Sequence, residues 1–320
     1  MPQTVTTLKK RQNQRRRFIF ICLLPTLICY AVFYLYSIVT VFVSSFMKWD
    51  YSNLNSPRFL DMSHIFDNYR YIFQDYPFFK EALTNSLIWA IAGVLVQVPL
   101  AVLVALALSK KLRGWKLVRN IYIIPSVISS ATMGLIFLQI YNPNYGIVTS
   151  LVKMINPNFT GAILLTPGWN LVAMTCAYIF FAGASCMMVL GQIFSVPQAI
   201  YEAAMLDGIS GWRREWYITL PMIRDTIKTI SVLAATSGFL LYNEVYFLTR
   251  GAAGTKSISY IIRDLAVGSS RTQYARANTI GVFQIVGGML IILTINLIFR
   301  TPKKQANRLK AAMSNDKGGK

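Results

Sequence analysis

The sequence is poor in charged and metal-binding side chains. Charged residues make up only 14% of its 320 residues, whereas a soluble domain usually carries about 25%. The single histidine, His64, belongs to no cluster with cysteines or carboxylates, which argues against a metal site. The four cysteines all lie inside apolar runs and so do not read as an extracellular disulfide framework: Cys22, Cys29, Cys176 and Cys186.

Recognisable catalytic patterns are missing too. The chain contains no HExxH or GxSxG motif, no Walker A loop and no pair of carboxylates that would face a pocket. We therefore expect a non-catalytic protein without a cofactor. If such a protein moves a solute uphill, a separate subunit must hydrolyse the nucleotide.

Long apolar runs are what the chain has in abundance. Hydrophobic residues make up 54% of it, and the mean hydropathy is +0.46. An apolar stretch of about 20 residues spans a bilayer as a helix. Six such stretches occur, at about 18–46, 82–108, 120–141, 171–194, 229–249 and 279–299. The pattern predicts an all-α polytopic membrane protein with six transmembrane helices. The first run is too long for a signal peptide, so it should remain attached.

The basic residues predict the orientation in the membrane. Of 32 Lys and Arg residues, 22 fall in the N-terminal tail and in 109–119, 195–228 and 300–320. An excess of positive charge on alternate connections marks the cytoplasmic side, and it also suits contact with anionic lipids. Both termini are therefore expected in the cytoplasm. The net charge of +20 then reflects topology, and we expect no nucleic-acid partner.

These features predict three parts along the chain. A basic cytoplasmic N-terminal tail covers 1–17, a six-helix transmembrane domain covers 18–300, and a cytoplasmic C-terminal tail covers 301–320. The only sizeable inner connection, 195–228, reads as a helix that begins near Ser195 and Pro197 and ends at Gly208. A second short helix should follow it.

Two interpretations of this inner connection are open. It is either an amphipathic loop on the membrane surface or a short bent rod that docks on a protein partner. Membrane-surface helices usually have a large apolar face and a basic polar face. Here the apolar face is small, and the acidic and basic residues nearly balance. A protein partner is therefore favoured.

The stretch EAAMLDG at residues 202–208, followed by Trp212 and by ITLP ending at Pro221, resembles the EAA loop of ABC importer permeases. The preceding VPQAIY is similar to the lead-in of the carbohydrate-uptake branch, which includes the maltose-type permeases. Four further stretches agree with that branch, so that the resemblance covers about residues 18–300: DNYRYIF, RGWKLVRNIYIIPSVIS, YNPNYGIVTSLV and YNEVYFLTRG.

This resemblance implies a permease subunit of an ABC importer in a bacterial or archaeal cell membrane. Its coupling helix, in the cytoplasm between helices 4 and 5, would contact the ATPase. The residues that match the ATPase-coupling motif are Glu202, Ala203, Ala204, Asp207 and Gly208. The implied partners are two cytoplasmic ATPase subunits, a second and different permease subunit, and an extracellular solute-binding protein.

Polar side chains inside the spans are costly and therefore indicate candidate solute contacts. The substrate pathway is predicted to include Tyr242, Asn243, Glu244, Tyr246, Gln139 and Gln284, while Asn85, Gln97 and Gln192 are further intramembrane amides. The alternative is that each amide bonds to a neighbouring helix. Aromatic, amide and carboxylate groups together suit a sugar or oligosaccharide. Another solute of the same branch, such as glycerol phosphate, and a stand-alone secondary transporter are the alternatives.

Overall fold

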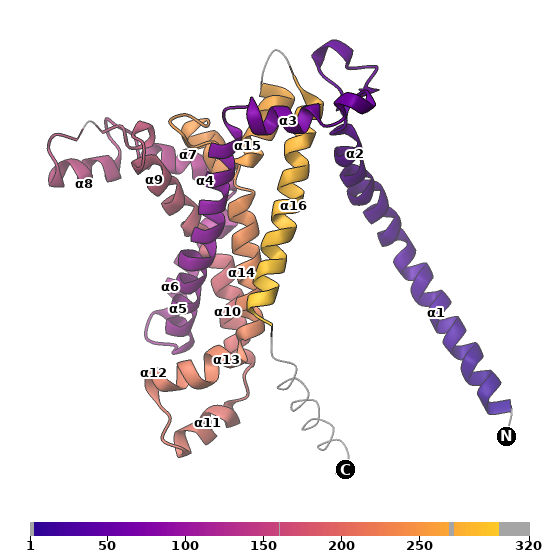
Figure 1. Ribbon diagram of the computed structural model, residues 1–320. Coiled ribbons are helices and arrows are strands. Elements are labelled where there is room, and N and C mark those ends of the chain that lie inside the picture. The colour runs from indigo at the N-terminus through magenta and orange to yellow at the C-terminus, as the bar shows by residue number, and fades with distance from the viewer. Residues whose placement is uncertain (1–2, 160, 269–271, 301–320) are drawn as a thin grey trace. The chain divides into compact units, whose positions relative to one another are not determined.

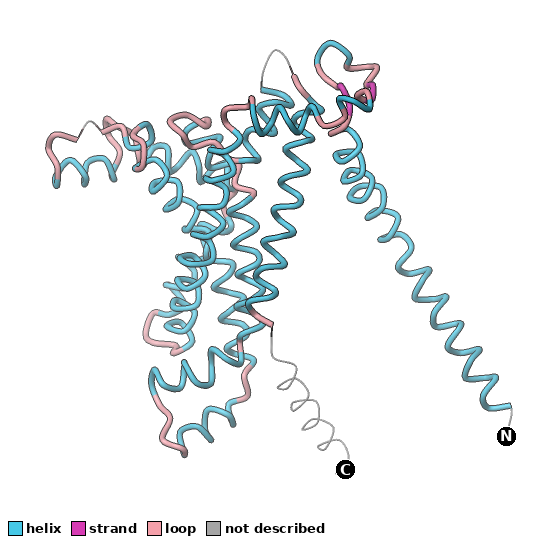
Figure 2. Tube along the Cα trace, viewed as in Figure 1, coloured by secondary structure: helices cyan, strands magenta, loops and turns pink. Residues whose placement is uncertain are grey.

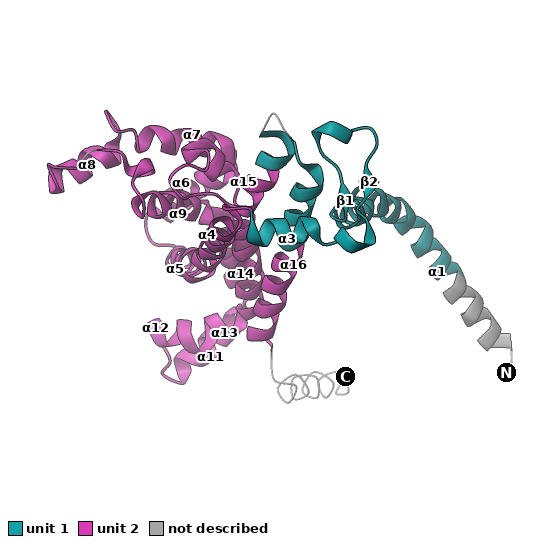
Figure 3. Cartoon of the chain, turned by 45° about the horizontal axis from the view of Figure 1, so that its top comes forward, with its two compact units in different colours: residues 1–75, 264–283 teal, residues 76–263, 284–320 magenta. Residues whose placement is uncertain are grey.

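The computed structural model describes residues 3–159, 161–268 and 272–300. The predicted C-terminal tail, 301–320, lies outside the described residues. The chain divides into two compact units, which are coloured separately in Figure 3. Unit 1 consists of Met1–Asp75 and Asp264–Phe283, and unit 2 consists of Tyr76–Arg263 and Gln284–Lys320.

Unit 1 begins with a long helix. It runs through α1 (Gln3–Tyr30), a π turn (Ala31–Leu35) and α2 (Tyr36–Ser44), so helical structure starts well before the predicted Phe18. Large apolar side chains along it are exposed, as expected for a helix that faces lipid tails. The remaining elements of this unit are β1 (Met47–Lys48), 3-10 turns Tyr51–Asn53 and Met62–His64, β2 (Arg58–Phe59), α3 (Asp67–Gln74), a π turn Asp264–Gly268 and the start of α16; β1 and β2 pair in antiparallel fashion.

Besides this first helix, whose part Gln14–Ser44 is long and apolar enough to span a membrane, three more of the predicted spans are confirmed as long apolar helices. The first combines α4 (Phe79–Ala92), a π turn (Gly93–Gln97) and α5 (Val98–Ser109). The second combines α9 (Trp169–Ile179), a 3-10 turn (Phe180–Ala182) and α10 (Gly183–Ser195). The third is α16 (Tyr274–Ile298), which continues from unit 1 into unit 2.

The predicted span at 120–141 is two helices rather than one. α6 (Trp115–Val127) and α7 (Ser130–Ile140) meet at an angle of 103°. Ile128 and Ser129 both have extended backbone, and the Ser129 hydroxyl accepts a hydrogen bond from the Thr132 N–H at 3.2 Å. Ser129 therefore caps a new helix within the apolar stretch.

The predicted continuous helix at 229–249 is also wrong. α14 (Arg224–Phe239) ends inside this stretch, residues 240–242 are not helical, and helical geometry resumes before a π turn at Val245–Thr249. Neighbours satisfy the polar groups at the break. The Ser259 hydroxyl donates to the Leu240 carbonyl, and the Asn243 amide donates to the Ser130 hydroxyl. Irregular backbone at membrane depth requires such partners.

Four helices in the described part of the chain are long and apolar enough to cross a membrane, or five if the α6–α7 pair counts as one span. The shorter elements of unit 2 lie toward its two ends (Figures 1 and 2). One end carries α8 (Ile147–Ile155), a 3-10 turn Ile163–Leu165 and α15 (Ile258–Arg263), and the opposite end carries α11 (Gln198–Leu206), α12 (Gly211–Arg214), a π turn Glu215–Thr219 and α13 (Leu220–Met222).

The core of unit 2 lies where α4 packs on α14 and α5 packs on α10. Small residues bring these helices close together. A methyl group on Gly238 of α14 would overlap the carbonyl oxygen of Trp89, and one on Gly93 would lie 2.7 Å from the carbonyl oxygen of Ala234. Small residues at helix contacts are the usual way in which membrane helices approach one another, because no hydrophobic driving force remains between them in lipid.

The close contact between Gly238 and the Trp89 carbonyl predicts that one added methyl group will lower the stability of the fold. Gly238→Ala should force α14 away from α4 and destabilise the fold by roughly 1–3 kcal/mol, the usual cost of overpacking. Gly191→Ala in α10 is the matched control, since nothing lies within 4 Å of the added methyl group. Thermal unfolding of the purified proteins should show a lower Tm for Gly238→Ala only. Equal Tm values for the two variants would contradict the close contact.

Candidate functional site

The segment from α11 to α13 begins at Pro197, directly after a bend in the chain at Val196. Pro197 occupies the N-cap position of α11 with φ −59° and ψ 132°. Ser195, which the sequence suggested as the cap, instead ends α10 and donates its hydroxyl to the Gln192 carbonyl at 2.8 Å. α12 follows Ser210 as predicted, but helical structure continues through Pro221 rather than ending before it.

Gly208 ends α11 in a left-handed conformation, with φ +76°. The Ile209 N–H bonds to the Ala204 carbonyl at 2.8 Å, and the Gly208 N–H bonds to the Met205 carbonyl at 3.1 Å. These two bonds form a Schellman motif, in which a glycine after the last helical residue reverses the chain. Nothing lies within 4 Å of a methyl group placed on Gly208, so its backbone conformation, not lack of space, calls for glycine.

The five coupling-motif residues lie together on this segment and divide into two sets. Glu202, Ala203, Asp207 and Gly208 are exposed, whereas Ala204 is buried. The two alanines of the motif therefore face different ways. Ala203 leaves the outer face of α11 without a large side chain. Ala204 allows α11 to pack closely on the rest of this permease.

Side chains of the same segment hold α11 against the elements that follow it. The Arg214 guanidinium lies 5.0 Å from the centre of the Tyr201 ring and donates to the Glu215 carboxylate at 2.8 Å. Glu215 is buried, and Thr219 bonds to the Tyr201 hydroxyl at 3.4 Å. Removing either partner of a buried ion pair leaves an uncompensated charge. These contacts hold α11 in place against the helical turns that follow it. We call residues 197–222 the braced rod.

The expectation of a small apolar face on this segment is wrong, because several large hydrophobic side chains are exposed on it. Large hydrophobic side chains exposed on it are Met205, Leu206, Trp212, Trp216 and Tyr217, and Leu206 is 90% exposed. Exposed apolar and aromatic side chains that gather on one segment suit contact with another molecule. Together with the bare outer face at Ala203, this composition suits a protein groove.

A second site is a polar cavity of about 560 Å³ inside unit 2. It opens where α14 breaks, so that the irregular backbone at 240–242 forms part of its wall. The lining residues are Gln97, Ser126, Ser130, Tyr178, Phe181, Ala184, Ser185, Met188, Leu233, Ala234, Ser237, Leu240, Leu241, Tyr242, Asn243 and Glu244. A cavity with apolar walls and a few convergent polar groups is the common form of a small-molecule site.

The cavity brings together three of the predicted pathway residues, Tyr242, Asn243 and Glu244. Tyr246 is not in its wall but stacks on the Tyr242 ring, with the ring centres 5.6 Å apart. The other two predicted residues lie elsewhere. Gln139 is exposed and accepts a hydrogen bond from the Tyr145 hydroxyl, and Gln284 donates to the Ser259 hydroxyl.

Gln97 is the lining residue that the predicted pathway set lacked. It is buried, and its Oε1 atom has no hydrogen-bond partner among the described residues. The hydroxyl-bearing lining residues were missed as well, because a serine or tyrosine inside an apolar span gives the same signal whether it packs against a helix or faces a cavity. The intramembrane amide was the one available signal for Gln97, and it did not separate Gln97 from Asn85.

Asn85 has a structural role in unit 2. Its amide donates to the carbonyls of Gly254 and Lys256 at 2.8 and 2.9 Å. Asn170 adds a third such bond, to the Ala253 carbonyl at 2.7 Å. These bonds fix the loop that precedes α15. Asn85 therefore has a structural partner, as the alternative for the intramembrane amides expected, but the partner is a loop rather than a neighbouring helix.

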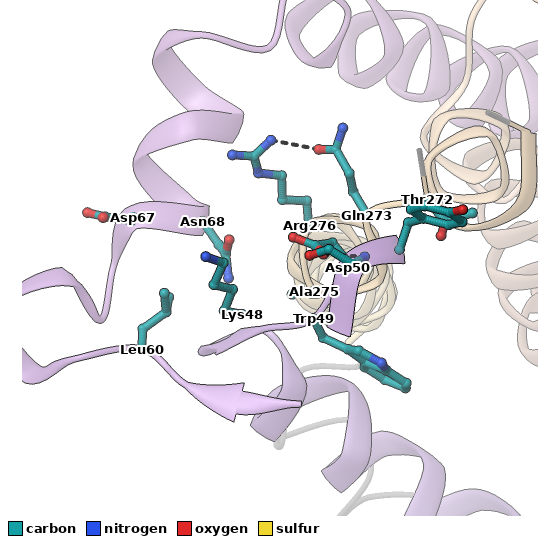
Figure 4. A pocket seen from close by; sticks show the side chains of 12 residues that line it. Lys48, Trp49, Asp50, Leu60, Asp67, Asn68, Thr272, Gln273, Ala275 and Arg276 are labelled. Atoms are coloured by element: carbon teal, nitrogen blue, oxygen red, sulfur yellow. Dashed lines mark hydrogen bonds between the residues drawn. The ribbon is translucent and has the colours of Figure 1, made fainter. Parts of the chain in front are cut away.

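Unit 1 contains a separate cavity of about 620 Å³, shown in Figure 4. Several of its polar groups are occupied by local bonds. Asp50 accepts from the Ser52 hydroxyl and N–H, and these bonds hold the pKa of its carboxyl below the usual value. Arg276 lies 3.5 Å from the centre of the Tyr71 ring and donates to Gln273, the dashed line in Figure 4. These contacts stabilise the unit and do not single out a ligand.

Comparison with known proteins agrees with this architecture. Residues 97–301 match the family model described as "binding-protein-dependent transport system inner membrane component". The probable ABC transporter permease protein YurN of Bacillus subtilis is 29% identical and aligns over 92% of this chain and 99% of its own length. The multiple sugar-binding transport system permease protein MsmF of Streptococcus mutans is 26% identical over 91% and 98% of the two chains.

Solved structures show the same fold. A chain of a bacterial ABC transporter involved in the import of the acidic polysaccharide alginate superimposes with a TM-score of 0.75, at 23% identity, over 91% of this chain and 97% of that one. The family model alone covers more than half of the sequence. The chain therefore belongs to the family of binding-protein-dependent transport system inner membrane components and is a multi-pass membrane permease of an ABC importer.

Proposed function

We propose that this permease carries a sugar or oligosaccharide through the membrane along a path that includes the polar cavity. The observation that carries the proposal is the opening of the cavity at the break after α14, where amide, hydroxyl and carboxylate groups converge. Broken helices that line a cavity are where transporters bind their solutes. Relatives named for multiple sugars and for arabinooligosaccharides support a saccharide.

The proposed topology has six spans with both termini in the cytoplasm. It counts the bent α6–α7 pair as one span and the interrupted stretch 229–249 as another. The distribution of Lys and Arg supports this orientation, because 22 of the 32 fall on the proposed inner side. Residues 1–17 and 301–320 are then cytoplasmic tails around a permease domain at 18–300.

The braced rod from α11 to α13 is the proposed contact with a cytoplasmic ATPase. The four exposed motif residues would contact the ATPase: Glu202, Ala203, Asp207 and Gly208. Ala204 would allow α11 to pack closely on the rest of the permease. Support comes from the exposure of the first four residues and from the apolar surface beside them. The ATPase would supply the energy, since the sequence of this chain has no nucleotide-binding motif.

The assembled transporter would contain two such ATPase subunits, a second and different permease, and a solute-binding protein outside the membrane. A structural neighbour was solved as an alginate transporter in complex with an alginate pentasaccharide-bound periplasmic protein. In this chain, the loop before α15 lies at the end of unit 2 opposite the rod (Figure 1) and is the proposed outer surface of that unit.

Within the pathway, we assign solute contacts to Tyr242, Asn243 and Glu244, and we add Gln97. Tyr246 would support Tyr242 from behind through ring stacking. Gln139 and Gln284 lie outside the cavity wall, so they stay predictions of the sequence alone.

The turn at Gly208 gives a graded test of the coupling rod. A β-branched residue at φ +76° is strongly disfavoured, whereas asparagine tolerates this region better than most residues. Gly208→Val should therefore cause at least an approximately tenfold fall in uptake and a loss of ATPase from the purified permease, for a backbone cost of about 1–2 kcal/mol. Gly208→Asn should retain most of both. Full ATPase retention in Gly208→Val would contradict the proposed docking.

The cavity assignment predicts a change in KM at one glutamine. Gln97→Leu removes a hydrogen-bonding group from the wall, so the KM for uptake should rise about fivefold to tenfold, equivalent to one bond of roughly 1–1.5 kcal/mol. The Tm should not fall, since leucine replaces a buried atom that has no partner. Gln139→Leu is the control and should leave KM unchanged. Identical KM values for the two variants would remove Gln97 from the pathway.

A further inference from the structure

The polar cavity carries charge of only one sign. Among its 16 lining residues, Glu244 is the one acid, and lysine, arginine and histidine do not occur. The other polar groups are amides and hydroxyls. The wall that this permease contributes to the pathway therefore contains no cation that could accompany an anionic solute.

Glu244 also has no counter-charge of its own. Its side chain is largely buried, with 6% of the residue exposed. The ion pairs among the described residues join His64 to Asp67 and Arg214 to Glu215, and both lie elsewhere. Arg263, on α15, lies over the Tyr246 ring at 4.7 Å from its centre. Among the described residues, Glu244 forms no ion pair, and it lies in the cavity wall, where its carboxyl group can contact a solute.

The hydrogen-bonding groups of the wall show a related imbalance. Two donors are already used, because the Tyr178 hydroxyl donates to the Ala234 carbonyl and the Asn243 amide donates to the Ser130 hydroxyl. Acceptors remain open at the Glu244 carboxylate and at Gln97 Oε1. An amide can turn to present either its oxygen or its NH₂ group, so Gln97 suits any hydroxyl. The Glu244 carboxylate can only accept hydrogen bonds, so it determines which solute charge the cavity prefers.

We infer that this cavity admits uncharged sugars and amino sugars and rejects saccharides that carry carboxylate or phosphate groups. The inference rests on the proposed pathway through the cavity. Neutral hydroxyls and ammonium groups can donate to Glu244, whereas an acidic group would meet no cation in the wall and would be repelled by the carboxylate.

The free-energy cost of entering the cavity is high only for saccharides that carry an acidic group. A carboxylate loses hydration when it enters a largely apolar cavity, and that loss is offset only by a nearby cation or by several donors. Here the wall provides no cation, and its donors are uncharged amides and hydroxyls. The fold is shared with a transporter of the acidic polysaccharide alginate, so solute charge is set by lining residues rather than by the fold.

A charged thiol reagent can measure the field in the cavity without any transport. Ser185 lies in the wall and is half-buried, and Ser185→Cys gives a reactive thiol there. The three exposed cysteines, Cys22, Cys29 and Cys176, would first be replaced by alanine. The purified complete transporter is then labelled with two methanethiosulfonates of similar size, one with a trimethylammonium group and one with a sulfonate group. The ratio of the two rates cancels the reactivity of the thiol itself.

Glu244→Gln should lower the ratio of cationic to anionic labelling about tenfold, which corresponds to about 1.4 kcal/mol. Glu81→Gln is the matched control, since the Glu81 carboxylate lies outside the cavity wall and accepts from the Lys256 N–H. That control should leave the ratio unchanged. A ratio that stays within twofold in Glu244→Gln would overturn the inference. Retention of the ATPase on both variants verifies that they assemble.

Saccharides then separate this inference from the proposed pathway. Maltotriose and the glucosamine trimer should slow labelling of Ser185→Cys, and the galacturonate trimer should do so only after Glu244→Gln. If the ratio depends on Glu244 but none of the three saccharides protects the thiol, the cavity is charged but lies off the pathway, and the proposed function fails with the inference. If the galacturonate trimer protects the unmodified cavity as well as maltotriose does, the pathway stands and the charge preference is wrong.

Discussion

Every backbone polar group at membrane depth needs a hydrogen-bond partner, and this requirement decides where the permease can depart from helix. At the interruption after Phe239, one side chain from α15 bonds to the freed backbone, and a second bond joins two side chains. Ser259 donates to the Leu240 carbonyl, and Asn243 donates to Ser130. α14 can therefore stop inside the apolar part of the chain without stranding these groups. The polar cavity exists because this break exists, since 240–242 form part of its wall.

α14 joins the braced rod to the polar cavity. α13 ends at Met222, α14 begins at Arg224, and α14 ends where the cavity opens. Its buried face packs on α4 at Gly93 and Gly238, positions too close to a neighbouring backbone to admit a methyl group. Close-packed interiors transmit displacement rather than absorb it. In the proposed coupling, a movement of the braced rod would reach the cavity through α14.

The sequence predicted the parts that depend on local composition. Apolar length predicted the spans at 82–108, 171–194 and 279–299, and the glycine after EAAMLD predicted the left-handed turn at Gly208. It missed the break at Ser129 because hydropathy averaged over a span does not show which serine will cap a helix with its hydroxyl. It also could not separate Asn85 from Gln97. Both are buried amides in one apolar run, and only the distant loop at Gly254 and Lys256 makes the first structural.

The break also accounts for the presence of an acid at this depth. In a continuous helix over 229–249, Glu244 would lie inside the apolar span, where a charge is costly, up to roughly 3 kcal/mol at the centre on insertion scales. In the structure it lies at the start of the helical segment that resumes after the break, next to the Val245–Thr249 turn. Free N–H groups at the start of a helix favour a negative charge. The interruption that opens the cavity thus also makes room for the carboxylate that gives the cavity its charge preference, so solute selectivity and the irregular backbone have one structural origin.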